Sequence, residues 1–186
     1  MRIATLGPHG NNHELIALRY LAKHGQAANQ LQLFEQFSDA FEALMAGNVS
    51  HVLQCTAHFA HSDCVGRYMH RAYPVDTFIA GSKPLALIAR KGVHNPRQVA
   101  IQPATRYYTD LSRFSDIVEA PTTVAVAEGL LAGIFEAGIC AEETVQQAPE
   151  ALELLRPLGP AMDAWVVYAT TPLSTSSPLL LNGNAC

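Results

Sequence analysis

Short apolar runs alternate along this chain with stretches whose apolar residues follow helical spacing, and this alternation constrains its fold more than any other feature. Strands are expected at residues 2–6, 31–34, 51–54, 99–101, 117–118, 138–140, 152–158 and 162–169, with two more extended stretches between residues 72 and 89. Helices are expected at residues 15–21, from a cap at Ser38 or Asp39 to Gly47, at 105–114 and at 122–134. Strands that alternate with helices at this spacing predict an α/β fold with mostly parallel sheets.

The segment Gly81-Ser82-Lys83-Pro84 interrupts the two extended stretches, and its composition suits a crossing between two lobes. The strand expected at Met162–Ala169 would return the chain to the first lobe. We therefore expect residues 1–81 and 160–186 to form lobe 1 and residues 82–159 to form lobe 2, with a cleft between the lobes.

Composition excludes several classes of function. The net charge of −4 comes with scattered Lys and Arg, so no basic face is expected for nucleic acid. The first residues lack the pattern of an export signal, and no run reaches the ~20 apolar residues of a membrane span. Four cysteines, at 55, 64, 140 and 186, show no disulfide-framework spacing. A soluble, cytoplasmic protein with reduced thiols and no contact with membranes is expected.

The loop from Gly7 to His13 leaves an expected strand and enters an expected helix. Ligands bind beyond the carboxyl ends of parallel strands, where free N–H groups and the helix dipole favour an anion. We expect residues His9, Gly10, Asn11 and Asn12 to bind a carboxylate. In the alternative, Asn11 or Asn12 only caps the helix, and His9 and His13 face solvent.

The second lobe repeats this arrangement twice. Thr105 and Arg106 follow one expected strand, and Thr122 and Thr123 follow the next. Hydroxyl groups at these helix starts would bind a substrate with two acidic groups, and Arg106 would add a charge-assisted contact. The alternatives are plain N-caps for the threonines and a solvated helix residue for Arg106.

Residues that could transfer protons lie on expected strands or shortly after them. His58 follows the third strand and is a candidate acid or base, because histidine titrates near neutral pH; the alternative is a half-buried loop histidine. Cys55 could pair with His58 as a nucleophile, or simply be buried. Asp163 lies on the returning strand beside Trp165, which core packing also explains. Cys55, His58, His61 and Cys64 are spaced every three residues, but helical geometry places the outer pair on opposite faces, so no metal is expected.

The stretch Ile3–Glu14 resembles the opening of prephenate dehydratase domains, a strand followed by a G-P-x-G-T-x-S/H loop. The resemblance continues in order through the segments F-S-D-A-F-E-A-L, Lys83–Leu87, Gln102–Thr105 and Thr122–Ala127, and covers about 165 residues. It implies a periplasmic-binding-protein type II-like fold, as in the catalytic domain of that family.

Three departures separate the chain from ordinary dehydratases. Gln54–His58 stands where that family has a P-I-E-N-S type motif, and Met162–Trp165 stands where it has the T-R-F motif with the catalytic threonine. Asn11 replaces the loop threonine. The chain is more similar to short offshoots of the family, the prephenate decarboxylases of bacilysin-type pathways and the dehydratase-like proteins of tropodithietic-acid pathways.

The resemblance implies a cofactor-free lyase of secondary metabolism that dehydrates or decarboxylates prephenate or a related cyclic carboxylate, such as a step in antibiotic biosynthesis. His58, Thr105 and Asp163 are the expected proton-transfer residues, and Cys55 is placed with the substrate-binding loop. The resemblance also implies a homodimer. Two alternatives stay open: a non-catalytic module that binds a small carboxylate, and an elimination or sulfur-handling step on a tropone-type precursor.

Overall fold

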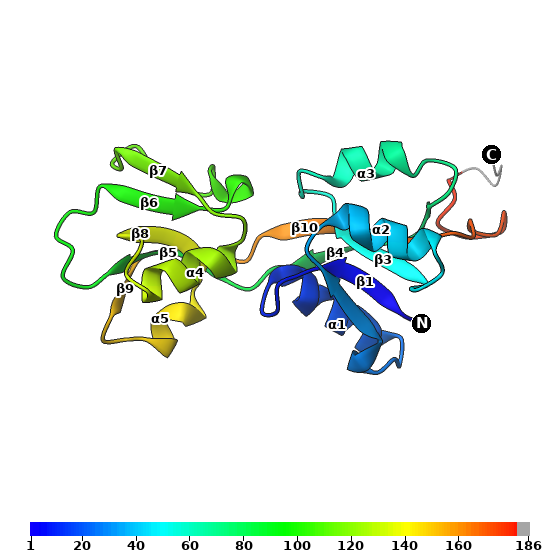
Figure 1. Ribbon diagram of the computed structural model, residues 1–186, viewed down its shortest axis with the longest axis horizontal. Helices are drawn as coiled ribbons and strands as arrows, with labels where there is room; N and C mark the ends of the chain where they lie inside the picture. The colour runs from blue at the N-terminus through cyan, green and yellow to red at the C-terminus, as the bar shows by residue number, and fades with distance from the viewer. Residues whose placement is uncertain (182–186) are drawn as a thin grey trace. The chain divides into compact units, whose positions relative to one another are not determined.

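The computed structural model describes residues 1–181, and residues 182–186, with Cys186 among them, lie outside the described part. The chain divides into two compact units. Unit 1 combines Met1–Ala80 with Asp163–Cys186, and unit 2 is Gly81–Met162. Each unit is built around one five-stranded sheet with helices packed on it (Figure 1).

The sheet of unit 1 has the strand order β2-β1-β3-β10-β4. Its strands are β1 (Ile3–Leu6), β2 (Leu31–Phe34), β3 (His51–Cys55), β4 (Tyr73–Gly81) and β10 (Met162–Ala169). Strand β1 pairs in parallel with β2 and β3, whereas β10 pairs antiparallel with β3, with Trp165 opposite Cys55. The expected parallel arrangement therefore holds for three strands, and the returning strand makes the sheet mixed.

Helix α1 (Asn12–Lys23) covers one face of this sheet, and α2 (Phe37–Met45) and α3 (His61–Arg67) cover the other (Figure 1). Successive strand residues point to opposite faces, so both faces are apolar. Ile3 and Leu53 pack towards α1, and Ala4 and Val52 pack towards α2 and α3. A short 3-10 turn, η1 (Ala28–Gln30), precedes β2.

Helix α2 begins earlier than the sequence indicates. Ser38 and Asp39, the expected caps, lie inside its first turn, and Gln36 takes the cap position without a side-chain hydrogen bond. The buried ring of Phe37, which is 1% exposed, draws the helix start towards the core. Burial of that apolar residue outweighs the missing cap bond.

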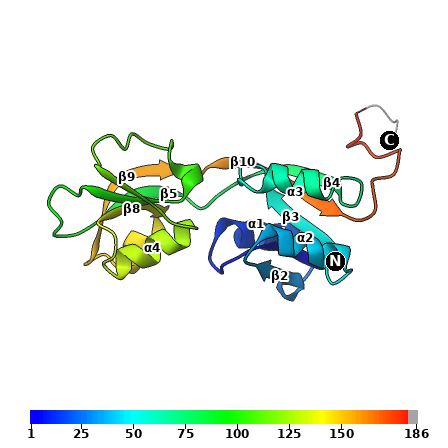
Figure 2. The ribbon, with the colours of Figure 1, turned by 45° about the horizontal axis from the view of Figure 1, so that its top comes forward.

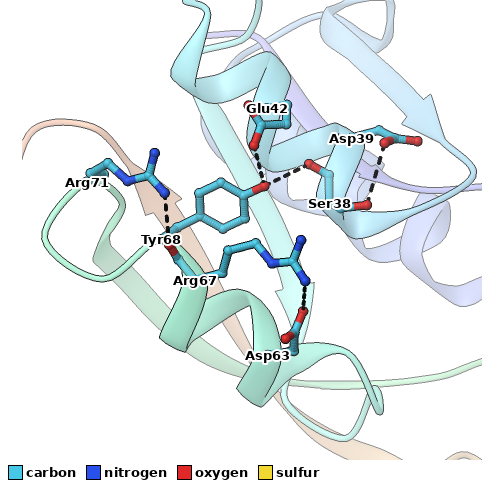
Figure 3. Close-up of polar contacts among 7 residues, drawn as sticks. All are labelled: Ser38, Asp39, Glu42, Asp63, Arg67, Tyr68 and Arg71. Atoms are coloured by element: carbon cyan, nitrogen blue, oxygen red, sulfur yellow. Dashed lines mark hydrogen bonds and ion pairs between the residues drawn. The ribbon is translucent and has the colours of Figure 1, made fainter.

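Tyr68, directly after α3, fastens that helix to α2. Its hydroxyl donates to Glu42 Oε1 at 2.7 Å and lies 3.3 Å from the carbonyl oxygen of Ser38 (Figure 3). Its ring stacks on Phe41 at 4.9 Å between centroids. Burial, followed by the hydrogen bond and charge of Glu42, raises the pKa of Tyr68 to about 12, so the phenol stays protonated and donates. These contacts hold the C-terminal end of α3 against α2.

Substitution of Tyr68 by phenylalanine is expected to lower the free energy of unfolding by about 2 kcal/mol, because one hydrogen bond to a charged group is lost while the ring packing is kept. Arg67→Ala is the matched control, since it removes the exposed ion pair with Asp63 at 3.1 Å in the same region (Figure 3). Its expected effect is below about 0.5 kcal/mol. Denaturant titration measures both, and equal effects would contradict the fastening role of Tyr68.

Unit 2 has the strand order β7-β6-β8-β5-β9. Its strands are β5 (Leu85–Arg90), β6 (Gln98–Ile101), β7 (Asp116–Glu119), β8 (Ala137–Ala141) and β9 (Leu152–Gly159). Strands β6, β7 and β8 run in parallel (Figure 1), and β5 lies antiparallel between β8 and β9 (Figure 2). Helices α4 (Thr123–Leu131) and α5 (Glu143–Gln147) pack on one face.

The helix expected at residues 105–114 does not form. The structure has a short 3-10 turn, η2 (Pro103–Thr105), followed by irregular chain. Leu111 and Phe114 are buried against the sheet face opposite α4, and their spacing of three residues imitates one turn of helix. The Asp110 carboxylate accepts a hydrogen bond from the Ser112 N–H at 2.9 Å, a local turn that competes with a helix.

No helix within residues 1–181 has the length and apolar composition needed to cross a membrane.

Candidate functional site

Four rings meet where the carboxyl ends of β1 and β3 lead into helices. They are His13 in the first turn of α1, Phe37 at the start of α2, His58 in the loop after β3, and Trp165 in β10, and we call them the histidine–aromatic cluster. The ring centroid of His13 lies 5.3 Å from Phe37, 5.7 Å from His58 and 5.2 Å from Trp165. Phe37 and His58 lie 5.0 Å apart. All four contacts are edge-to-face, the arrangement that aromatic rings favour.

His13 keeps some exposed surface as a residue, but its Nε2 atom is inaccessible to solvent and has no hydrogen-bond partner within residues 1–181. Burial, with a smaller effect of the His58 charge, lowers the pKa of His13 to about 3. The ring is therefore neutral at physiological pH. The alternative that His9 and His13 face solvent is wrong for His13, since its ring is packed among three others.

His58 has a defined proton arrangement. Its Nδ1 accepts a hydrogen bond from the Ala60 N–H at 3.2 Å, so the proton of the neutral ring sits on Nε2. Burial and then the charge of His61 lower the pKa of His58, which favours the neutral form near pH 7. His58 thus offers an N–H group at Nε2, and the Ala60 bond disfavours the imidazolium that a general acid would need.

His61, at the start of α3, binds across to the returning strand. Its Nε2 lies 3.0 Å from the hydroxyl of Tyr168. Burial, with a smaller effect of Cys64, raises the pKa of Tyr168 to about 12, and burial lowers the pKa of His61. The protonated phenol therefore donates to a neutral imidazole, and this contact ties α3 to β10.

Asp163 and Cys55 lie close to each other on the paired strands β10 and β3. Burial raises the pKa of the half-buried Asp163 carboxyl, which favours its protonated form. Burial also raises the pKa of Cys55 to about 11, with two opposing backbone hydrogen bonds and a further increase from the Asp163 charge. Cys55 therefore stays a thiol near neutral pH, a poor nucleophile for covalent chemistry with His58.

The three described cysteines, Cys55, Cys64 and Cys140, are free and buried. Burial raises the pKa of each thiol. With Cys186 changed to serine, alkylation by iodoacetamide is expected to be at least about tenfold slower in the native protein than in denaturant, because the thiolate is the reactive form. Mass spectrometry over time measures this, and rapid labelling of Cys55 in the native protein would contradict it.

The loop before α1 makes most of its polar contacts with itself. Asn11 Oδ1 accepts from the Glu14 N–H at 2.8 Å, and Asn11 Nδ2 donates to the Leu6 carbonyl at 3.1 Å. The Glu14 carboxylate accepts from the Gly10 N–H at 2.5 Å and lies 2.7 Å from His9 Nδ1. Asn11 is thus the N-cap of α1, and a carboxylate of the chain itself lies at this helix start. Binding of a further anion by residues 9–12 stays a prediction.

Two predicted residues of unit 2 follow β6. Thr105 is buried, and its hydroxyl donates to the Gln102 carbonyl at 2.8 Å. Arg106 forms a partly exposed ion pair with Glu119 at 3.6 Å. Their assigned roles in proton transfer and substrate binding stay predictions, and each side chain has a structural partner within unit 2.

The other two follow β7, at the same edge of the sheet. Thr122 is the N-cap of α4, and its hydroxyl accepts from the Ala125 N–H at 3.0 Å. Thr123 is the first residue of the helix. Thr122 is thus an N-cap, as the alternative interpretation stated. Carboxylate binding by Thr122 and Thr123 stays a prediction.

Some of the residues in this part of unit 1 were predicted from the sequence and others were not. Cys55 ends β3 and His58 follows it in the next loop, whereas Asp163 comes near Cys55 through the pairing of β10 with β3. His13 and Phe37 were not expected there, and the only signal was their position at helix starts after neighbouring strands. Among residues 1–181, no group of three or more His, Cys, Asp or Glu residues is arranged to hold a metal ion.

Comparison with known families gives no match to any family model, and no curated protein matches the sequence. Solved structures do match. Prephenate dehydratase of Arthrobacter aurescens, solved in complex with L-Phe, superposes with a TM-score of 0.68 at 18% identity, over 92% of this chain and 61% of that one. This chain therefore spans about three fifths of the length of that protein.

Two further structures share the fold. Prephenate dehydratase of Staphylococcus aureus gives a TM-score of 0.59 at 14% identity, over 92% of this chain and 67% of that one. The BvgS periplasmic VFT2 domain of Bordetella pertussis gives 0.53 at 11% identity, over 91% and 80%. These likenesses confirm the predicted α/β fold of the periplasmic-binding-protein type II kind, as in prephenate dehydratase structures.

Proposed function

We propose that this chain is a cofactor-free carbon–oxygen or carbon–carbon lyase that acts on prephenate or a related cyclic carboxylate. The observation that carries the proposal is His58, a neutral N–H donor among aromatic rings at the carboxyl ends of β1 and β3. The fold that holds it is shared with prephenate dehydratases. A role in secondary metabolism, a cytoplasmic location and a homodimer remain parts of the proposal.

The chemistry requires one proton. When a ring carboxylate leaves as carbon dioxide, its bonding electrons enter the ring, and either a hydroxyl group departs as water or a ring carbon is protonated. Both routes consume one proton and need the developing charge stabilised. In the proposed division of roles, Asp163, whose carboxyl pKa is raised by burial, supplies the proton, and His58 Nε2–H donates to the oxygen that gains charge.

The remaining predicted residues keep their proposed roles. Thr105 is a further proton-transfer candidate, and the substrate-binding candidates are His9, Gly10, Asn11, Asn12, Cys55, Arg106, Thr122 and Thr123. Most of these side chains already have partners inside their own unit, so His58 and Asp163 are the first two to test.

A second candidate function is a non-catalytic module that binds a small carboxylate. The likeness to the BvgS periplasmic VFT2 domain favours it, since that domain shares the fold and its name states no lyase activity. The engaged polar groups of residues 9–14 also suit a structural loop.

Incubation with prephenate separates the two functions. A lyase is expected to consume prephenate, release carbon dioxide and give a product whose mass and absorbance differ from those of a protein-free control. If the chain is a binding module, prephenate is expected to raise its melting temperature and to remain unconverted. If prephenate is neither converted nor bound, both candidate functions are rejected for this compound.

A further inference from the structure

The ring of His13 carries a polar atom that the described protein does not use. Its Nε2 is buried and has no hydrogen-bond partner within residues 1–181, although the ring lies among Phe37, His58 and Trp165. Leaving a buried nitrogen unpaired costs stability, and native structures rarely tolerate it without a bound group to satisfy it. A phenylalanine would fill the same space without that cost.

The neighbouring rings do not supply the missing partner. Trp165 Nε1 donates to the Ala80 carbonyl at 3.4 Å, and His58 Nδ1 already accepts from Ala60. Phe37 has no polar atom. The remaining polar atom of these rings is the N–H at His58 Nε2, which belongs to the proposed catalytic role.

We propose that Nε2 of His13 donates a hydrogen bond to an oxygen atom of the bound ring carboxylate, so that His13 is a binding residue beside His58. This inference rests on the proposed function for the identity of the ligand. A carboxylate or carbonyl oxygen only accepts hydrogen bonds, and a neutral imidazole with its proton on Nε2 is a suitable donor. The surrounding ring edges suit a flat cyclic molecule better than a flexible one.

The test measures the affinity of prephenate and of phenylpyruvate by calorimetry for the full chain and two variants. His13→Phe is expected to weaken binding at least about tenfold, because the hydrogen-bond donor to the ligand is lost. Its melting temperature is expected to be unchanged or higher, because the ring packing is kept and the unpaired polar atom is removed. His13→Gln, which restores an N–H donor, is expected to recover part of the affinity. The control is His94→Phe, which replaces an exposed histidine of unit 2 with no proposed role and is expected to bind within about twofold of the parent.

Imidazole nitrogen NMR supplies an independent measurement: saturating probe should shift the His13 Nε2 signal. The inference is overturned if His13→Phe binds both probes as tightly as the parent, if neither probe binds, or if the His13 signal does not move. Failure of the lyase proposal is distinguishable, because His13-dependent binding without turnover rejects catalysis alone. Turnover with an unchanged KM in His13→Phe rejects the inference alone.

Discussion

Substitution of His58 by alanine is expected to lower the turnover number on prephenate, or on the related carboxylate that the chain converts, by at least about 100-fold. The reason is the loss of a hydrogen-bond donor positioned for charge that develops in the transition state, an effect of about 10²–10³ in other enzymes. The KM is expected to change less than about threefold, since the contact strengthens mainly in the transition state.

A second substitution tests whether His58 acts as a hydrogen-bond donor or as a general acid or base. His58→Gln keeps an N–H donor on the side chain and is expected to retain more activity than His58→Ala. If His58 instead acted as a general acid or base, glutamine would be as inactive as alanine, and the rate would follow the titration of an imidazole. Because the Ala60 N–H holds His58 Nδ1 unprotonated, we expect a turnover number that does not vary with His58 ionisation near neutral pH.

Two controls make this prediction specific. His94→Ala removes an exposed histidine of unit 2 that has no proposed role and is expected to leave turnover within about twofold. Circular dichroism and melting temperature establish that each variant is folded. If turnover by His58→Ala stays within about threefold of the parent, the role of His58 is wrong.

Much of the fold could be predicted because its signals are local. The strands Leu31–Phe34 and Met162–Ala169 have the bounds that their apolar patterns indicate, since turns or caps border them. The helix expected at residues 105–114 failed because Leu111 and Phe114 are buried from irregular chain. Spacing alone does not distinguish two apolar anchors in a loop from one turn of helix.

The candidate site was less predictable, since it depends on contacts between distant segments. Cys55 and His58 could be placed near each other because Cys55 ends a strand and His58 follows it. Asp163 lies at the start of the returning strand, and only the antiparallel pairing of β10 with β3 brings it near Cys55. The burial of His13 depends on how α1 packs against Phe37 and Trp165, which are 24 and 152 residues away in the sequence. No local pattern distinguishes that histidine from His9, whose side chain is exposed and paired with Glu14.

Acid is expected to destabilise the protein, and His13 alone should lower the free energy of unfolding by about 2 kcal/mol between about pH 7.5 and pH 5. The folded protein lowers the pKa of His13 from 6.5 to about 3. Below the pKa of His13 in the unfolded chain, the unfolded chain therefore binds a proton that the buried ring of the native protein does not bind. The stabilisation is complete above 6.5 and is lost progressively as the pH falls towards 3.

Other groups modify the total but not the comparison that tests it. The pKa values of His51, His58 and His61 are also lowered, chiefly by burial, so these residues add to acid destabilisation. The raised pKa of Asp163 acts in the opposite direction, because the native carboxyl holds its proton more firmly.

Denaturant titration at the two pH values should show that His13→Phe loses about 2 kcal/mol less than the parent. His94→Phe, which replaces an exposed histidine of unit 2, should lose as much as the parent. Parallel losses in His13→Phe and the parent would show that His13 can take up a proton in the native protein, and its ring would then not be the buried neutral group described above.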